Sequence, residues 1–216
     1  MSHMRQKSTR FLLNAGLLCV VVVLLASCVG VDAKIRVTDS GSGDLIAEYR
    51  VSNELLSLGE LDENKAQLPI PLSRSDVESS LGKKNGLVLK SWSSSKSGKD
   101  TVIKMDIGFS SIDALIAYLD PEGKLARYDN ANGVTSLYFG LGGDFAPLDS
   151  DGKHLAIEAF DAYTFRLTVE APKAIKTADS NNTIVSSKID GKTASFSGAM
   201  KDIVISEKAP ALSVSW

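Results

Sequence analysis

Apolar and polar residues alternate along two neighbouring stretches that follow the first apolar run of the chain. Residues 31–38 alternate without a break, and residues 45–51 resume the same pattern. Period-two alternation is typical of a strand with one face in the core and the other in water. The stretch between them, residues 39–44, reads Asp-Ser-Gly-Ser-Gly-Asp, which is turn chemistry. The pattern therefore predicts a β-hairpin.

Polar caps followed by apolar residues at helical spacing predict helices. The clearest helix opens with Ser110 and Asp113 as a capping motif and ends at Pro121. Its apolar residues fall at i, i+3, i+4 and i+7, the spacing of one buried helix face. A second helix is expected to open with the capping box of Ser75 and Glu78. A third, short helix is expected around Leu55, Leu56 and Leu58, followed by a loop over 60–73.

Most of the remaining chain has strand patterns. Strands are expected at 87–93, 101–109, 124–128, 134–141, 163–170, 183–189, 192–197, 203–206 and 211–216. The polar residues 94–100 predict a solvated loop, and residues 155–160 fit either a helix turn or a strand. The sequence thus predicts an α+β fold, a mostly antiparallel sheet of hairpins with about three helices packed on one face.

The apolar run before the first strand has the features of an export signal. Arg5, Lys7 and Arg10 precede the run 11–24, and no acidic residue occurs before Asp32. The run has signal-peptide length. It ends in Leu-Ala-Ser-Cys at 25–28, which resembles the lipobox of bacterial lipoproteins. The resemblance implies a signal peptide over 1–27 and a single lipid-anchored domain over 28–216. The alternatives are an uncleaved transmembrane anchor and an ordinary secretory signal with a chance cysteine.

Cys28 is the predicted lipid-attachment site. In lipoproteins of this kind the thiol carries a diacylglycerol and the new amino group is acylated too, for example with palmitate. One acyl chain gives only marginal membrane binding, whereas two or more anchor a protein permanently. Val29 stands where many inner-membrane lipoproteins of Gram-negative bacteria carry Asp. The resemblance therefore implies the extracytoplasmic side of the envelope, and the outer membrane if the cell is Gram-negative.

Composition excludes several functions for residues 28–216. Three of the 24 basic residues and none of the 26 acidic residues precede Cys28, so the domain is acidic and has no basic stripe for nucleic acid. Cys28 is its one cysteine and His154 its one histidine. Disulfides, cysteine nucleophiles and multi-histidine zinc sites are therefore excluded. We expect no enzyme activity, no cofactor and no metal.

Three short motifs resemble functional sites but have ordinary structural explanations. Asp149, Asp151, Gly152 and Glu158 match part of a calcium-binding loop, but Pro147 replaces its first ligand, so an acidic turn is favoured. The glycines at 140–143 lack the spacing of a dinucleotide site and favour a flexible loop. Ser93 and Lys96 form a Ser-x-x-Lys without its partner motifs, and His154 has no nucleophile to serve.

Aromatic residues at strand spacing can form either a core or the lining of a ligand cavity. They are Trp92, Phe109, Tyr138, Phe139, Phe160, Phe165, Phe196 and Trp216.

The residues after Cys28 are also similar to the LppM-type family of bacterial lipoproteins. The similarity rests on the 31–37 strand, the 39–43 turn, Tyr-Arg-Val-Ser at 49–52 and the strand with its closing proline at 163–172. Members of that family resemble START-like lipid-binding domains. A helix-grip fold ends in a long helix, whereas this chain ends in a strand pattern at 211–216, so no ligand residue is carried over.

Two functions remain open. One is a non-enzymatic binding module that holds an envelope lipid or glycolipid between sheet and helices, in an enclosed apolar cavity. The other is a structural or protein-interaction lipoprotein that holds an envelope protein through a strand edge or a loop face. A hydrolase is disfavoured because no nucleophile-base pair is visible.

Overall fold

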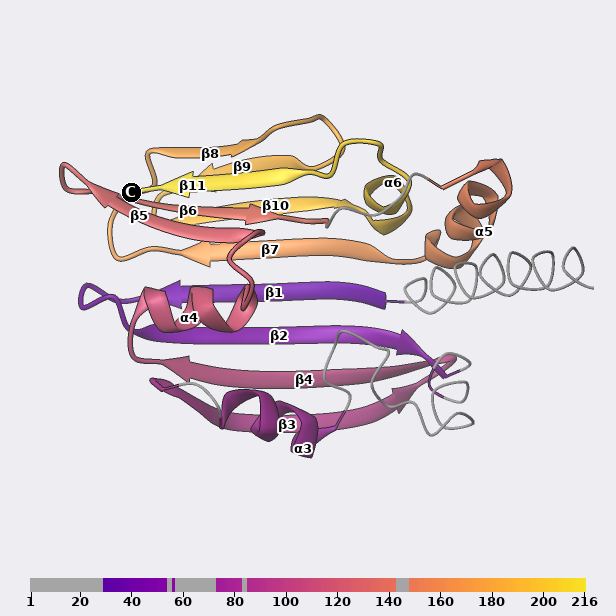
Figure 1. Ribbon diagram of the computed structural model, residues 1–216, viewed down its shortest axis with the longest axis horizontal. Helices are drawn as coiled ribbons and strands as arrows, with labels where there is room; N and C mark the ends of the chain where they lie inside the picture. The colour runs from indigo at the N-terminus through magenta and orange to yellow at the C-terminus, as the bar shows by residue number, and fades with distance from the viewer. Residues whose placement is uncertain (1–28, 54–55, 57–72, 83–84, 143–147) are drawn as a thin grey trace, which may run out of the picture.

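The computed structural model describes residues 29–53, 56, 73–82, 85–142 and 148–216, which form two β-sheets and four helices (Figure 1). The larger sheet has seven strands in the order β3-β4-β2-β1-β7-β10-β9, and the smaller has four in the order β5-β6-β11-β8. The strands of the larger sheet are β1 (Val29–Val37), β2 (Gly43–Ser52), β3 (Leu87–Ser97), β4 (Asp100–Phe109), β7 (Thr164–Glu170), β9 (Ser186–Asp190) and β10 (Thr193–Ala199). Those of the smaller sheet are β5 (Ala126–Ala131), β6 (Val134–Gly140), β8 (Thr177–Ser180) and β11 (Ala211–Ser215).

The hairpin predicted first is the centre of the larger sheet. β1 pairs with β2 in the antiparallel direction from Val29 opposite Val51 to Val37 opposite Gly43. On its other side β1 pairs with β7 in the parallel direction, with Val31 opposite Phe165. All other pairs in both sheets are antiparallel. Gly43 is required at the turn, because a Cβ there would lie 1.8 Å from the carbonyl oxygen of Arg36. The α+β fold is therefore confirmed, with two sheets rather than one.

Helices cover the inner face and one end of the larger sheet. The described helices are α3 (Arg74–Leu81), α4 (Ile112–Leu119), α5 (Ser150–Phe160) and α6 (Met200–Val204). In Figure 1, α4 lies in front of β1 and β2 and α3 in front of β3, whereas α5 and α6 lie together at the end where β1 begins. None of the helices in the described ranges is long and apolar enough to cross a lipid bilayer.

One core cluster joins the two sheets. Apolar side chains of alternate residues in β1, β2 and β4 point into the core, on the side where α3 and α4 lie. Those of β7 and β10 face the smaller sheet. Phe196 of β10, Leu212 of β11 and Leu137 of β6 belong to the same cluster and are almost fully buried. The space between the two layers is thus filled by side chains.

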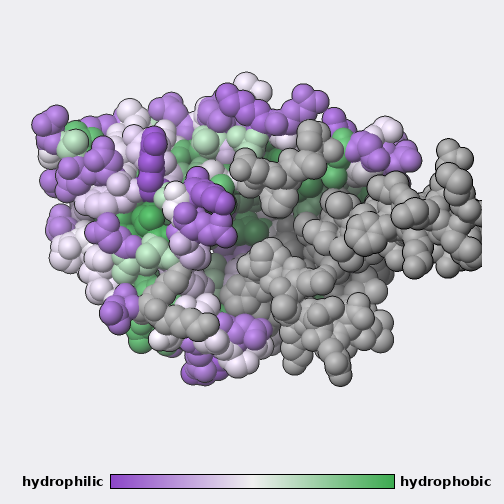
Figure 2. All heavy atoms as spheres, viewed as in Figure 1, coloured by the Kyte–Doolittle hydropathy of each residue, from purple (hydrophilic) through white to green (hydrophobic). Residues whose placement is uncertain are grey.

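In the view of Figure 2, hydrophilic residues occupy much of the outline, and hydrophobic residues appear in small patches. The face of the larger sheet that points away from the core is its open face. It carries Asp32, Lys34, Arg36, Glu48, Lys104 and Arg166, which alternate with the buried residues. The prediction that the central strands have one wet face is therefore confirmed.

Several predicted boundaries were wrong. β3 continues through 94–97, so the expected loop is a two-residue turn at Gly98 and Lys99. Residues 203–206 are not a strand, because Ile203 and Val204 belong to α6. β8 was not predicted, the strand expected at 183–189 begins only at Ser186, and the ambiguous residues 155–160 belong to α5.

The helix starts were also displaced. α3 is capped by Ser73 rather than Ser75: Asp76 donates its backbone N–H to the Ser73 Oγ (3.1 Å), and Ser73 donates its own to Asp76 Oδ2 (2.9 Å). α4 is capped by Ser111, one residue after the predicted Ser110. The helix predicted around Leu55 to Leu58, the loop over 60–73, the signal peptide over 1–27 and Cys28 lie largely or wholly outside the described residues.

Candidate functional site

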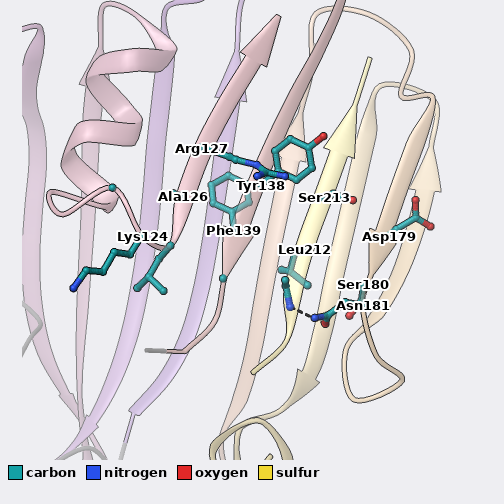
Figure 3. A pocket seen from close by; sticks show the side chains of 14 residues that line it. Lys124, Ala126, Arg127, Tyr138, Phe139, Asp179, Ser180, Asn181, Leu212 and Ser213 are labelled. Carbon is teal, nitrogen blue, oxygen red and sulfur yellow. Dashed lines mark hydrogen bonds between the residues drawn. The ribbon is translucent and has the colours of Figure 1, made fainter. Parts of the chain in front are cut away.

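A hollow lies on the outer face of the smaller sheet, and we call it the outer groove (Figure 3). Its volume is about 610 Å³, within the range of roughly 300–1,000 Å³ that is usual for small-molecule sites. All four strands of the sheet contribute to it.

Two cross-strand rows build the outer groove. The first row is Arg127, Tyr138, Ser213 and Asp179, each opposite the next on the neighbouring strand. The second row lies two residues away on the same face and has small residues at its centre, Gly140 opposite Ala211. Leu125 and Asn181 lie at the two ends of this row and are joined to it by backbone hydrogen bonds. The Gly140 N–H donates to the Leu125 carbonyl oxygen (2.6 Å), and the Asn181 N–H donates to the Ala211 carbonyl oxygen (3.0 Å). The hollow exists because neither central residue fills the space above the sheet.

The wall of the groove combines an aromatic ring with cations and hydrogen-bonding groups. The Arg127 guanidinium lies over the Tyr138 ring, with its carbon 4.1 Å from the ring centroid. Figure 3 shows these two side chains stacked on one side of the groove and Asp179 on the far strand. Asn181 is held in place because its Oδ1 accepts the backbone N–H of Ala211 at 2.8 Å. Such a lining suits a ligand that has both a flat apolar face and polar substituents.

Asp120 fixes the start of the β5 wall. This residue ends α4 and is buried, and its Oδ2 accepts the backbone N–H groups of Leu125 and of Ala126, the latter at 2.7 Å. Hydrogen bonds from the backbone, that of Ala126 first, lower the pKa of Asp120 below its ordinary value. A carboxylate at this position therefore holds Leu125 at the edge of the groove.

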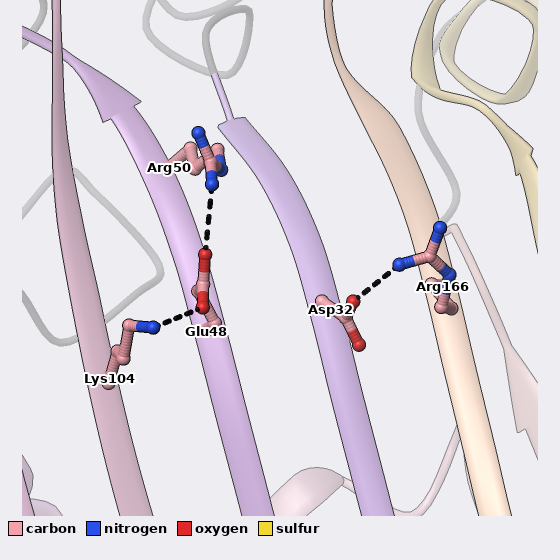
Figure 4. Close-up of polar contacts among 5 residues, drawn as sticks. All are labelled: Asp32, Glu48, Arg50, Lys104 and Arg166. Carbon is pink, nitrogen blue, oxygen red and sulfur yellow. Dashed lines mark hydrogen bonds and ion pairs between the residues drawn. The ribbon is translucent and has the colours of Figure 1, made fainter. Parts of the chain in front are cut away.

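A charged row crosses four strands on the open face of the larger sheet (Figure 4). Asp32 of β1 and Glu48 of β2 lie opposite each other at its centre. Arg166 of β7 donates from Nη1 to Asp32 Oδ2 at 2.8 Å, and Lys104 of β4 lies 2.8 Å from Glu48 Oε2. Arg50 donates from Nη2 to Glu48 Oε1 at 3.3 Å. The two adjacent carboxylates are thus compensated by cations on both sides.

Replacing Lys104 with glutamine (Lys104→Gln) is expected to raise the pKa of Glu48 toward its ordinary value of 4.5. The hydrogen bond from Lys104 is the main cause that lowers this pKa. Because the folded-state pKa is lowered, the pair stabilises the fold above about pH 4.5 and loses its effect as the pH falls through the folded-state value. The difference in unfolding free energy between the two proteins should therefore shrink in acid. Carboxyl ¹³C NMR titration measures the shift.

Glu170 provides the internal control for this titration. Its pKa is also lowered, chiefly by Lys34 of β1, whose Nζ lies 2.7 Å from Glu170 Oε2. Lys104→Gln should leave the Glu170 titration unchanged. An unmoved Glu48 titration, or equal movement of both carboxyls, would contradict this account of the row.

Comparisons with known proteins give a remote likeness in structure and none in sequence. No protein-family model matches the sequence, and no curated protein matches it. The fold is similar to the folded domain of LppM from Mycobacterium tuberculosis, solved by NMR. The TM-score is 0.43 at 13% sequence identity, over 88% of this chain and 89% of that chain. At these values no residue or ligand is transferred to this chain.

The aromatic residues singled out in the sequence are divided between core and groove. Phe109, Phe139, Phe160, Phe196 and Trp216 are buried, and Trp92 and Phe165 pack partly buried against the core. Tyr138 and Phe139 are the two of this set that line the outer groove. Of the two roles left open for these residues, most therefore belong to the core, and the outer groove lies on the side of the smaller sheet that points away from that core.

The weak chemical motifs take ordinary structural positions. Asp149 caps α5 by accepting the backbone N–H of Gly152 at 2.8 Å, so Asp151 and Glu158 belong to a helix and not to a calcium loop or an acidic turn. Ser93 and Lys96 are exposed on β3. Over the ranges that the structure describes, no three His, Cys, Asp or Glu side chains gather as a metal site would require.

The sequence did not reveal most of the groove. Arg127, Asp179 and Ser213 gave no local signal, because they come together only through strand pairing. Gly140 falls at the end of the strand predicted over 134–141, and it ends β6, but nothing in the sequence indicated that it forms part of the groove floor.

Proposed function

We propose that this protein is a lipid-anchored lipoprotein of the bacterial cell envelope that binds a glycolipid, or the polar head of a lipid, without converting it. Residues 1–27 would be its signal peptide and acylated Cys28 its anchor. The observation that carries the binding function is the outer groove, where the Arg127 guanidinium, an aromatic ring and hydrogen-bonding groups lie beside two small residues.

The anchor leads straight into the fold. β1 begins at Val29, the residue after Cys28, so no linker separates the proposed anchor from the central strand of the larger sheet. A strand rises about 3.3 Å per residue, so the end of the larger sheet at which β1 begins would lie close to the lipid surface. This end of the sheet also includes the end of β2, the β3–β4 turn and the α5–β7 junction.

The shape of the groove favours a polar head over a fully enclosed acyl chain. Burial of apolar surface stabilises a complex by about 25 cal/mol per Å², so an acyl chain gains most in an enclosed cavity. The outer groove is open, and its rim carries Lys124, Arg127, Asp179 and Asn181. Cationic and amide groups of this kind suit phosphate and sugar hydroxyl groups.

The absence of catalysis is part of the proposal. Among the described residues that line the groove, Asp179 is the one carboxylate, and neither histidine nor cysteine occurs. Hydrolysis of a glycosidic bond ordinarily uses a pair of carboxylates, one on either side of that bond. The groove therefore offers binding groups rather than a reacting pair.

The test is native mass spectrometry of the protein extracted from bacterial membranes in mild detergent. We expect an adduct of lipid or glycolipid mass on the wild-type protein. Ala211→Trp should reduce the adduct at least tenfold, because Ala211 is exposed at the centre of the groove and an indole would occupy it. Removing the stacked ring by Tyr138→Ala should also weaken binding.

Ser136→Trp is the matched control. Ser136 lies on the same face of β6 as Tyr138, two residues away and outside the groove lining. This variant should keep the adduct. A wild-type protein that carries no adduct, or an adduct equally abundant in Ala211→Trp, would refute binding in the groove.

A structural role in binding an envelope protein is the second candidate. β3 has eleven residues and pairs on one side with β4, and no other described strand pairs with its second side. Most of its residues after Leu89 are exposed. An edge strand of this length can accept a strand from another chain. A stoichiometric protein partner in the same mass spectra, in place of a lipid adduct, would favour this role.

A further inference from the structure

A second hollow lies on the open face of the larger sheet, at the end where β1 begins. Its volume is about 330 Å³, and polar residues dominate its lining. The hollow exists because Gly30, opposite Arg50 in the β1–β2 register, has no side chain. A Cβ at Gly30 would lie 3.2 Å from Cδ1 of Tyr163, which forms part of the wall.

Two arginines and two carboxylates line this hollow. Arg50 pairs with Glu48 and Arg166 pairs with Asp32, as Figure 4 shows. The side chains of Arg50 and Arg166 are 52% and 56% exposed, so both guanidinium groups are open to solvent. A guanidinium has five N–H donors, and each of these pairs uses one nitrogen. Exposed ion pairs contribute only about 0–1 kcal/mol, so a ligand that offers better partners can rearrange them.

We propose that this hollow binds a phosphoethanolamine headgroup. The phosphate would lie against Arg50 and Arg166, and the ammonium against Asp32 and Glu48. A simple anion would be repelled by the two carboxylates, and a simple cation by the two guanidinium groups. A dipolar ligand with both charges a few bonds apart matches both sets. Bidentate contacts between arginine and phosphate supply geometric specificity.

The position of the hollow agrees with a lipid as the source of this headgroup, and this step rests on the proposed anchor. Gly30 is two residues after Cys28. At about 3.3 Å per residue along a strand, the hollow lies within roughly 7 Å of the anchored residue along the chain. Headgroups of the anchoring membrane would thus be its nearest ligands.

The test is an isothermal calorimetric titration of the detergent-purified full protein with sn-glycero-3-phosphoethanolamine. We expect saturable binding, and at least tenfold weaker binding of sn-glycero-3-phosphoglycerol, which lacks the amine, and of ethanolamine, which lacks the phosphate. Arg166→Gln should weaken binding about tenfold. Gly30→Val, which adds a side chain at the floor, should do the same without changing a charge.

Arg36→Gln is the control, because Arg36 lies on the same face of β1 and also pairs with a carboxylate, Glu170 (3.3 Å), but outside the hollow. It should bind like the wild type. Failure of the wild-type protein to bind, equal binding of all three compounds, or equal losses in Arg36→Gln and Arg166→Gln would overturn the proposal.

Vesicles distinguish a lipid headgroup from a free compound. Protein in phosphatidylcholine vesicles should bind added glycerophosphoethanolamine, and phosphatidylethanolamine in the vesicles should compete with it. If vesicles that contain phosphatidylethanolamine leave the binding of glycerophosphoethanolamine undiminished, the free compound is the ligand and the lipid source is overturned. The detergent titration needs no anchor, so a protein that binds the headgroup yet proves not to be acylated would refute the proposed anchor alone.

Discussion

Replacement of Cys28 with serine (Cys28→Ser) is expected to abolish labelling of the protein by radioactive palmitate in growing bacteria. Thioether attachment of diacylglycerol requires the sulfur, and a serine hydroxyl cannot take its place in this signal. Each buried CH₂ of an acyl chain contributes about 0.8 kcal/mol to membrane binding, so the loss of two or more chains removes many orders of magnitude of affinity. This is the largest effect that we expect of any single substitution in the chain.

Labelling is the decisive measurement, because an uncleaved apolar segment could keep the variant in the membrane fraction without any lipid. Cys19→Ser is the matched control, since Cys19 is the other cysteine of the sequence and lies inside the apolar run. It should be labelled like the wild type. Labelling that survives in Cys28→Ser, or a wild-type protein that takes up no label, would refute acylation of Cys28 and with it the lipid anchor.

The parts of the fold that were predictable are those where local pattern and tertiary environment agree. Alternation in 31–38 and 45–51 predicted β1 and β2 because one face of each strand is in the core and the other is in water. The Asn132–Gly133 turn between β5 and β6 has positive φ at both residues, as a tight hairpin turn requires. Asn and Gly adopt this conformation easily, so the sequence carried the signal.

The elements that were missed depend on tertiary contacts. β8 contains Thr, Ala, Asp and Ser, and only Ala178 is buried, so no alternation was visible. It is a strand because it pairs with β11. α6 has β-branched residues that suggested a strand, but Met200 donates its backbone N–H to Tyr163 (3.0 Å) at the point where the helix begins. Short segments follow such contacts rather than propensity.

The two hollows were unpredictable for a related reason. Both arise where a small residue interrupts a row of larger side chains across a sheet, Gly140 and Ala211 in one case and Gly30 in the other. A row is defined by strand order and register, and the parallel pairing of β1 with β7 joins residues 134 positions apart, such as Asp32 and Arg166. Nothing in the local sequence of either strand specifies that partner.

Truncation of Phe196 to alanine (Phe196→Ala) is expected to lower the free energy of unfolding by about 3–5 kcal/mol, a large part of the stability of a typical domain. Phe196 has no exposed surface, lies opposite Leu167 in β7, and belongs to the cluster that joins the two sheets. Its removal leaves a cavity between the layers, because the strands on either side are held by their hydrogen-bonded ladders and cannot collapse into it. Urea unfolding followed by circular dichroism measures the change.

Ile189→Ala on the neighbouring β9 is the control for this truncation. Ile189 is 43% exposed and lies opposite Ala194 of β10, so its side chain loses little burial when it is shortened. Its cost should stay below about 1 kcal/mol, since exposed sites outside special contacts change stability little. Equal losses in the two variants would mean that the layers are not held together by this core.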